Sequence, residues 1–146
     1  MRFETLVRIA RQIEEVFAYV SDPGNFPAWN SAVETVRRTT GARAVGSTYA
    51  MKRRLPSGSA ANELEIVAFE QPREFAIRTT SGPTPFVYRY RFSPEDGETV
   101  VQLDAEVELG GTAALVGPLA RRFVKRGVDE NFATLKRILE ERSVTA

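Results

Sequence analysis

The chain has 146 residues, a formal net charge of +1, no cysteine and no histidine. This length suits one domain with one hydrophobic core, and the near-zero charge argues against nucleic acid as a partner, because such binding needs clustered phosphate contacts. The missing histidine and cysteine exclude disulfides, thiolate metal sites, cysteine nucleophiles and Ser-His-Asp triads.

Targeting and cofactor motifs are also missing from the sequence. Neither a signal-peptide apolar segment nor an apolar run of about 18 residues occurs, so we expect a cytoplasmic protein without a transmembrane segment. The sequence contains no GxGxxG motif, no P-loop and no cluster of metal ligands. We therefore expect no cofactor and no metal.

The N-terminal segment begins as a strand and continues as a helix. Residues 2–9 alternate apolar and polar side chains, apart from Leu6, which is typical of a half-buried strand. Apolar residues at 13, 16, 17 and 20 then recur at helical spacing, and the residues 21–24 (Ser-Asp-Pro-Gly) are a helix stop signal. Residues 26–30 predict a helical turn or a second, very short helix.

Six further strands follow, separated by turns that contain glycine or proline. They are predicted at residues 33–40, 48–55, 60–69, 74–80, 86–92 and 99–109. Because parallel pairing would need long crossover connections, these short turns indicate an antiparallel meander.

The helical period returns after Gly110 and Gly111. Pro118 suits the first turn of a helix that runs to Arg142 and would be about 37 Å long at 1.5 Å per residue. One i+4 stripe is predicted to face the sheet, and it consists of Leu119, Phe123, Gly127, Asn131, Leu135 and Leu139. The stripe is widened by Ala120, Val124, Val128, Phe132 and Ile138. The predicted order is thus β-α-α-β6-α, as a single domain over residues 1–146.

Several motifs accompany this order of elements. They are residues 16–23 leading to Phe26-Pro27-Ala28-Trp29, residues 45–49, residues 70–78, Tyr90-Arg91-Phe92, and residues 131–136. With these motifs the whole chain resembles the START-like, helix-grip superfamily also called SRPBCC, and within it the polyketide cyclase/dehydrase-type branch. The resemblance implies an α+β fold in which a seven-stranded curved antiparallel sheet wraps around the long C-terminal helix and leaves a ligand cavity. Such relatives include lipid-transfer domains, polyketide aromatase/cyclases, plant hormone and allergen-type binders, and quinone-binding proteins.

Alternation within each strand assigns the face that points to this helix. Gln102, Asp104, Glu106 and Glu108 must face water, because four unpaired buried polar groups would cost several kcal/mol, so the residues between them face inward. The same reasoning places Leu64, Ile66 and Ala68 inside. In the strand after Gly46 it places Tyr49, Met51 and Arg53 inside, unless a one-residue bulge shifts the register.

The inward positions predict a mostly apolar and aromatic ligand site with a few orienting polar groups. The predicted ligand-binding residues are Trp29, Tyr49, Met51, Arg53, Asn62, Leu64, Ile66, Phe75, Ile77, Phe86, Tyr88, Tyr90, Leu103, Phe123, Gly127 and Asn131. The alternative is that these residues form a fully packed core, because every half-buried sheet has such a face.

Three of these residues have two interpretations each. A glycine inside a helix costs about 1 kcal/mol relative to alanine, so Gly127 either leaves room for a ligand or allows close packing of helix and sheet. Asn131 either contacts a ligand or bonds to water. Trp29 lies either at the rim of the cavity or in the core.

Two functions fit this pattern best. The first is binding or carrying a hydrophobic small molecule, such as a lipid, a quinone or a polyketide, by a monomer or homodimer. The second is a polyketide cyclase or dehydratase in which Tyr49, Tyr88 or Tyr90 moves a proton and Arg53 stabilises an enolate. No inward position is clearly Asp or Glu, so an obvious base is missing and the binder is favoured. A third possibility is a protein-interaction module with a filled core.

Overall fold

The computed structural model describes residues 1–55, 58–108 and 117–142, and its elements follow the predicted β-α-α-β6-α order. They are β1 (Arg2–Ile9), α1 (Ile13–Val20), the 3-10 helix η1 (Pro23–Asn25), α2 (Phe26–Trp29), β2 (Val33–Thr40), β3 (Thr48–Leu55), β4 (Gly58–Glu70), β5 (Glu74–Ser81), β6 (Phe86–Glu95), β7 (Glu98–Val107) and α3 (Gly117–Glu140). Leu109, predicted as the end of the last strand, lies outside the described residues.

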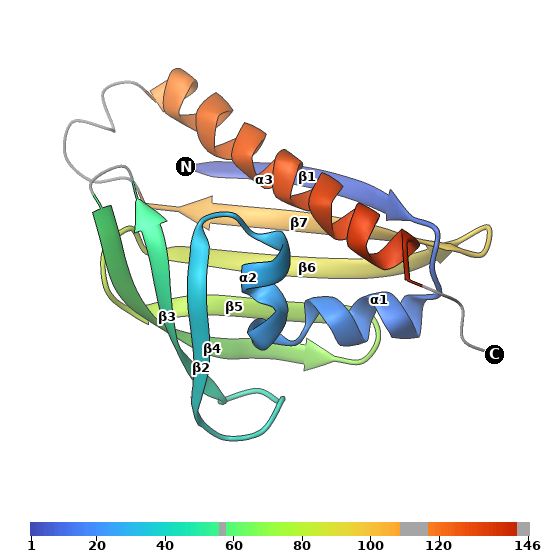
Figure 1. Ribbon diagram of the computed structural model, residues 1–146, viewed down its shortest axis with the longest axis horizontal. Helices are drawn as coiled ribbons and strands as arrows, with labels where there is room; N and C mark the ends of the chain where they lie inside the picture. The colour runs from blue at the N-terminus through green and yellow to red at the C-terminus, as the bar shows by residue number, and fades with distance from the viewer. Residues whose placement is uncertain (56–57, 109–116, 143–146) are drawn as a thin grey trace.

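The strands form one antiparallel sheet in the spatial order β1-β7-β6-β5-β4-β3-β2. Strands β2 to β7 neighbour one another in chain order, as a meander requires, and β1 completes the sheet by pairing with β7. Figure 1 shows the helices on one side of this curved sheet, with α3 running obliquely along β1. The predicted α+β architecture, a curved sheet gripping a long C-terminal helix, is confirmed.

The period-two pattern correctly assigned most inward side chains. In β7, Val101, Leu103 and Ala105 are at most 2% exposed. In β3, Tyr49 and Met51 are buried as predicted, because the bulges that disturb this part of the sheet lie in β2. The sheet therefore presents a continuous apolar inner face to the helices.

One inward assignment in β4 is wrong. Ala68 was predicted to face the helices, but the register shifts between Ile66 and Ala68, so that Phe69 pairs with Phe75. The extra residue of this bulge turns Phe69 inward, where its ring lies 5.3 Å from that of Phe17 in α1. The bulge thus adds an aromatic ring to the core beneath α1.

The N-terminal half of α3 is oriented differently from the predicted stripe. Phe123 is 75% exposed and Leu119 is 67% exposed, so the prediction that both face the sheet is wrong. A helix with 3.6 residues per turn rotates by about 40° at each i+4 step, so a strict i+4 stripe winds around the helix. It starts on the outer surface at Leu119 and reaches the core only near its C-terminal end. The side chains packed against the core are Val124, Val128, Phe132, Leu135, Ile138 and Leu139.

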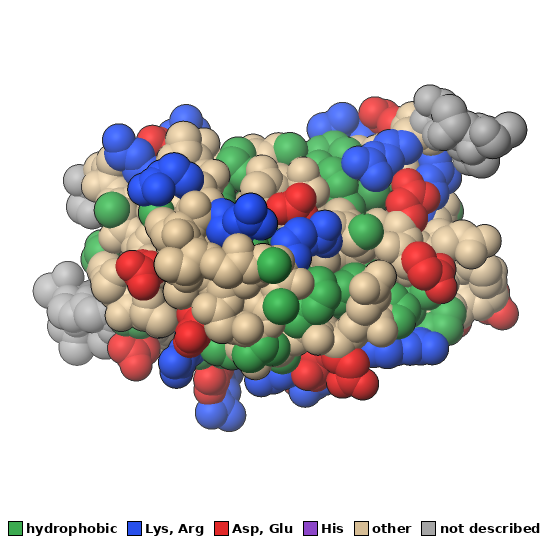
Figure 2. All heavy atoms as spheres, turned by 90° about the horizontal axis from the view of Figure 1, so that it is seen from below, with side chains coloured by type: hydrophobic (Ala, Val, Ile, Leu, Met, Phe, Trp, Pro, Cys, Tyr) green, Lys and Arg blue, Asp and Glu red, His purple; other side chains and the backbone are tan. Residues whose placement is uncertain are grey.

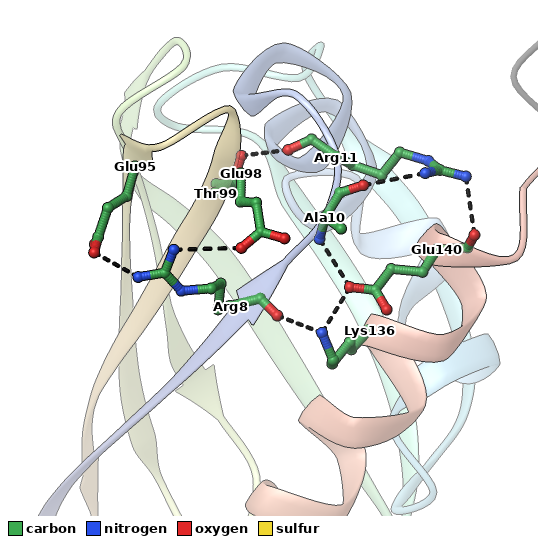
Figure 3. A network of polar contacts seen from close by, with 8 residues as sticks. All are labelled: Arg8, Ala10, Arg11, Glu95, Glu98, Thr99, Lys136 and Glu140. Carbon is green, nitrogen blue, oxygen red and sulfur yellow. Dashed lines mark hydrogen bonds and ion pairs between the residues drawn. The ribbon is translucent and has the colours of Figure 1, made fainter.

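The C-terminal end of α3 is fixed by a polar network that we call the clasp, formed by Arg11, Lys136 and Glu140 with the backbone after β1 (Figure 3). Glu140 Oε2 accepts hydrogen bonds from Ala10 N at 2.8 Å and from Lys136 Nζ at 2.6 Å. Lys136 Nζ also donates to Arg8 O at 2.8 Å. Arg11 Nη2 donates to Glu140 O at 2.9 Å, which satisfies a carbonyl that the helix end leaves open. The last turn of α3 is therefore bonded directly to β1.

We expect Glu140→Gln to weaken the clasp in a pH-dependent way. Hydrogen bonds from Lys136 and Ala10 hold the pKa of Glu140 below its usual value of 4.5. Because this pKa is lower in the folded than in the unfolded chain, the stabilisation is fully present above pH 4.5 and disappears as the pH falls through the folded-state pKa. Near neutral pH the variant should lose on the order of 1 kcal/mol of unfolding free energy, since the site is partly screened by solvent.

Urea denaturation of both proteins at a series of pH values measures this difference. Glu141→Gln is the matched control, because Glu141 forms only an exposed ion pair with Arg137 at 3.6 Å. A stability difference between wild type and Glu140→Gln that persists unchanged below pH 3 would contradict the role of the ionised carboxylate.

Candidate functional site

A polar corner lies at the end of the inner face where β3, β4 and the loop between β5 and β6 meet. Arg53 Nε donates to Asn62 Oδ1 at 2.7 Å, and Arg53 Nη2 donates to Pro83 O at 2.8 Å and to Thr84 O at 2.7 Å. The guanidinium carbon lies 5.2 Å from the centre of the Phe86 ring. The corner thus places a cation against the apolar inner face, held only by neutral oxygen atoms and an aromatic ring.

This corner differs from the outer face of the sheet, where arginines are paired with acids. Arg78 Nη2 lies 2.9 Å from Glu65 Oε1, and Arg89 Nη1 lies 3.0 Å from Glu74 Oε2. Figure 2 shows Lys and Arg side chains interspersed with Asp and Glu side chains on the face seen there. Arg53, in contrast, forms no ion pair within the described part of the chain, and burial lowers the pKa of its guanidinium.

Two tyrosines of β6 lie beside this corner on the inner face. The Tyr88 ring centre lies 4.5 Å from that of Phe86 and 6.4 Å from that of Tyr90. Burial raises the pKa of Tyr88 to about 12, an effect that the Arg53 charge partly offsets. Burial, and secondarily Tyr88, raise the pKa of Tyr90 as well. Both phenols are therefore protonated near neutral pH and can donate a hydrogen bond, but neither is a base there.

The N-terminal half of α3 lies at the same end of the molecule as this corner (Figure 1). A Cβ atom built on Gly127 would meet no atom within 4 Å. Val124, Val128 and Tyr88 pack against the core yet are only partly buried. Close helix-sheet packing is therefore not the reason for a glycine at position 127. The observations instead fit open volume beside the mid-helix glycine.

The described residues contain no group of three or more acidic side chains placed to hold a metal. Likewise, no helix in the described ranges is long and apolar enough to cross a membrane.

Residues 1–140 match the sequence family described as polyketide cyclase / dehydrase and lipid transport. The chain belongs to this family. No curated protein matches the sequence significantly.

Solved structures show that the family fold is shared at low sequence identity. A START superfamily protein from Mycobacterium smegmatis is 17% identical, with a TM-score of 0.77 and coverage of 96% of this chain and 97% of that chain. The ginseng major latex-like protein 151 from Panax ginseng is 10% identical, with a TM-score of 0.72 and coverage of 95% and 97%. The di-domain ARO/CYC StfQ from the steffimycin biosynthetic pathway is 15% identical, with a TM-score of 0.76; the match covers 97% of this chain and 51% of that one. The chain therefore has the START-like helix-grip fold and spans about half of the two-domain relative.

Within this family fold, the predicted ligand-binding residues separate into three groups. Arg53, Tyr88 and Gly127 are partly buried at the open end, whereas Phe123 points outward. The remaining twelve are less than 9% exposed, and they are Trp29, Tyr49, Met51, Asn62, Leu64, Ile66, Phe75, Ile77, Phe86, Tyr90, Leu103 and Asn131. Much of the inner face therefore packs as core, and the accessible part is confined to the end with Arg53.

The sequence left open whether Trp29 lies at the rim of a cavity or in the core, and the structure places it in the core. It is 3% exposed, and its ring centre lies 6.5 Å from that of Tyr90 and 6.3 Å from that of Phe132. Its Nε1 and the hydroxyl of Tyr49 are buried without a hydrogen-bond partner among the described residues. An unsatisfied buried donor costs about 1–3 kcal/mol, so these two atoms make the core less stable than full hydrogen bonding would.

Asn131 has a role that local sequence patterns did not reveal. Its Oδ1 accepts from Ser31 N at 3.1 Å and from Ser31 Oγ at 3.3 Å, while its Nδ2 donates to Asn30 Oδ1 at 3.1 Å. Neither a ligand contact nor a bond to water is needed to explain this side chain. It ties the middle of α3 to the segment that follows α2.

Two surface grooves near β1 contain none of the predicted ligand-binding residues. One, of about 670 Å³, lies between β1 and α3, and its Asp129 accepts hydrogen bonds from Thr5 and from Lys125. Partial burial raises the pKa of Asp129, but these two hydrogen bonds outweigh burial and keep the pKa below its usual value. The other, of about 620 Å³, lies on the outer side of the sheet and includes Arg89 and Arg121. Because Asp129 already pairs with Lys125 at 2.9 Å, its carboxylate is not a free charged group for a ligand.

Asn131→Ala should destabilise the protein by about 1–3 kcal/mol, because it removes three hydrogen bonds and leaves the Ser31 amide without its acceptor. This loss should exceed the stability gained from the higher helix propensity of alanine, which is less than about 1 kcal/mol. Urea denaturation gives the unfolding free energy. Thr134→Ala is the control, since Thr134 bonds only within its own helix, to Glu130 O at 3.2 Å. Equal stability of Asn131→Ala and Thr134→Ala would show that the Asn131 hydrogen bonds do not stabilise the attachment of α3 to the segment after α2.

Proposed function

We propose that the protein binds a hydrophobic small molecule, such as a lipid, a quinone or a polyketide-like compound, between the inner face of the sheet and the N-terminal half of α3. The observation that carries this proposal is the space at Gly127, where a Cβ would meet nothing within 4 Å, opposite a sheet whose inner face is apolar. A helix-interior glycine costs about 1 kcal/mol relative to alanine, and room for a ligand gives that cost a physical reason.

The walls of this space support an apolar ligand. The partly buried side chains packed against the core include Val36, Val124, Val128 and Tyr88. Ligand sites of this kind have mainly hydrophobic walls with a few polar groups that fix orientation, and Arg53 and Tyr88 supply such groups. Membership of a family that includes lipid transport agrees with this use of the fold, although fold alone does not determine function.

A polyketide cyclase or dehydratase is the second candidate, favoured by the family and by the pairing of Arg53 with Tyr88. Arg53 can stabilise an enolate, and a protonated tyrosine can act as an acid. A pKa of about 12 makes Tyr88 a poor base near neutral pH. The inner strand positions of the described residues carry no Asp or Glu that would replace it. Binding without proton transfer therefore fits these side chains better.

Native mass spectrometry of freshly purified protein, followed by organic extraction, tests the proposal. We expect a stoichiometric apolar adduct, because release of an apolar ligand from the inner face would expose apolar surface to water, which slows dissociation. A clean apo mass that remains after incubation with fatty acids, quinones and aromatic polyketides would oppose the proposal and favour a protein-interaction module.

Gly127→Leu should remove the adduct by filling the space that the glycine leaves. Overpacking of this kind costs about 1–3 kcal/mol, which corresponds to a loss of affinity of about 5- to 150-fold. Ala133→Leu is the matched control, because it adds similar bulk to an exposed position of the same helix. Unchanged ligand retention in a folded Gly127→Leu protein, judged by circular dichroism, would show that the ligand does not occupy this space.

A further inference from the structure

Arg53 has hydrogen-bonding capacity that the described residues do not use. A guanidinium carries five N–H donors. Nε donates to Asn62 Oδ1, and Nη2 donates to two backbone carbonyls, those of Pro83 and Thr84. Among the described residues, no acceptor lies within hydrogen-bonding distance of Nη1 in suitable geometry. Its two N–H groups are therefore available to another molecule.

The described residues also supply no counter-charge to Arg53. The neighbouring Arg54 points to the other side of the strand and pairs with Glu34 at 3.2 Å, whereas Arg53 forms no ion pair within the described residues. A partly buried cation held only by neutral acceptors loses hydration without gaining a counter-charge, which is unfavourable. Such a site attracts an anion.

The guanidinium is held in a fixed orientation. Asn62 Nδ2 donates to Ser81 O at 3.1 Å and to Pro83 O at 2.9 Å, so the group that receives Arg53 Nε is itself immobilised. Gly82 has a φ of +97°, and a Cβ at that position would lie 2.3 Å from Ala61 O, so the backbone of this loop is closely packed on β4. A donor fixed in this way loses little entropy when it binds a ligand.

Tyr88 supplies a second donor at the same corner. Its ring and the Arg53 guanidinium both lie against the ring of Phe86. The Tyr88 hydroxyl makes no hydrogen bond to the described residues, and its phenol stays protonated near neutral pH, so it can donate. An arginine and a tyrosine that lie against the same ring can together donate to the two oxygen atoms of a carboxylate.

We propose that Arg53 Nη1, assisted by the Tyr88 hydroxyl, binds the carboxylate of an amphipathic organic acid whose apolar part fills the space beside Gly127. This inference rests on the proposed function and narrows it, because it excludes neutral apolar molecules as the preferred ligands. The acid enters with its charged end at the corner formed by β3, β4 and the β5–β6 loop.

Calorimetric titration near pH 7 with two matched pairs of probes tests the proposal: dodecanoate against dodecanol, and 1-naphthoate against 1-naphthalenemethanol. For the wild type we expect at least one acid to bind about tenfold or more tightly than its alcohol. In Arg53→Met this preference should fall to about one, while the alcohol binds as before. Tyr88→Phe should reduce the preference by about threefold.

Arg54→Met is the matched control, since it removes a neighbouring arginine from the outer side of the same strand and should leave the preference intact. A purely structural role for Arg53 would lower the unfolding free energy of Arg53→Met without changing the acid-to-alcohol preference. The wild-type preference needs no variant, so the test stands even if Arg53→Met fails to fold. Equal binding of acid and alcohol to the wild type would overturn this inference alone. Failure of all four probes to bind would overturn the proposed function as well.

Discussion

The attachment of α3 to β1 at its C-terminal end determines how the rest of the molecule can be arranged. Glu140, Lys136 and Arg11 bond the last turn of the helix to the backbone that follows β1, and Leu135 and Leu139 are fully buried just before it. A helix fixed so firmly at one end has its direction set there. Its other half also contacts β1, where Thr5 donates a hydrogen bond to Asp129, but Leu119 and Phe123 remain exposed.

The interior along α3 has two parts. Around the middle of α3, Trp29, Tyr90 and Phe132 pack against one another, and Asn131 bonds the helix to the segment after α2. Toward the C-terminal end of the helix the core is closed. Toward the N-terminal end, Gly127 faces open space and the Arg53 corner is only partly covered. The cluster of Trp29, Tyr90 and Phe132 thus separates the closed core from the partly covered end at Arg53. Open volume at that end does not weaken the main core.

The sequence was sufficient to predict what depends on local periodicity. The order of elements, the antiparallel sheet and most inward residues, Tyr49 and Leu103 among them, follow from a side-chain period of two and from short turns. Two predictions failed because the true period departs from the ideal one. A bulge after Ile66 turns Phe69, and not Ala68, toward the helices. The i+4 stripe of α3 winds around the helix, so that Phe123 faces outward.

Contacts between distant segments could not be predicted in the same way. Asn131 meets Ser31 across 100 residues, and Arg53 meets the carbonyls of Pro83 and Thr84 across about 30. Both contacts depend on how loops fold back on the sheet, which no local pattern specifies. Sequence reasoning could nominate Arg53 and Asn131 as inward polar residues, but it could not tell that Asn131 is fully engaged while Arg53 keeps free donors.

The polar groups of the inner face also bear on which of the family's activities this chain supports. Catalysis of proton transfer near neutral pH works best with a group whose pKa lies near the working pH. In the accessible part of this site, burial moves the pKa of Tyr88 up to about 12, and the charge of Arg53 offsets only part of that shift. Arg53 itself stays protonated, because burial lowers its pKa from a starting value of 12.5 that is far above neutrality. Both groups are therefore fixed donors whose protonation does not change across the physiological range. Fixed donors of this kind are suited to binding and orienting an anion, and they are poorly suited to proton transfer.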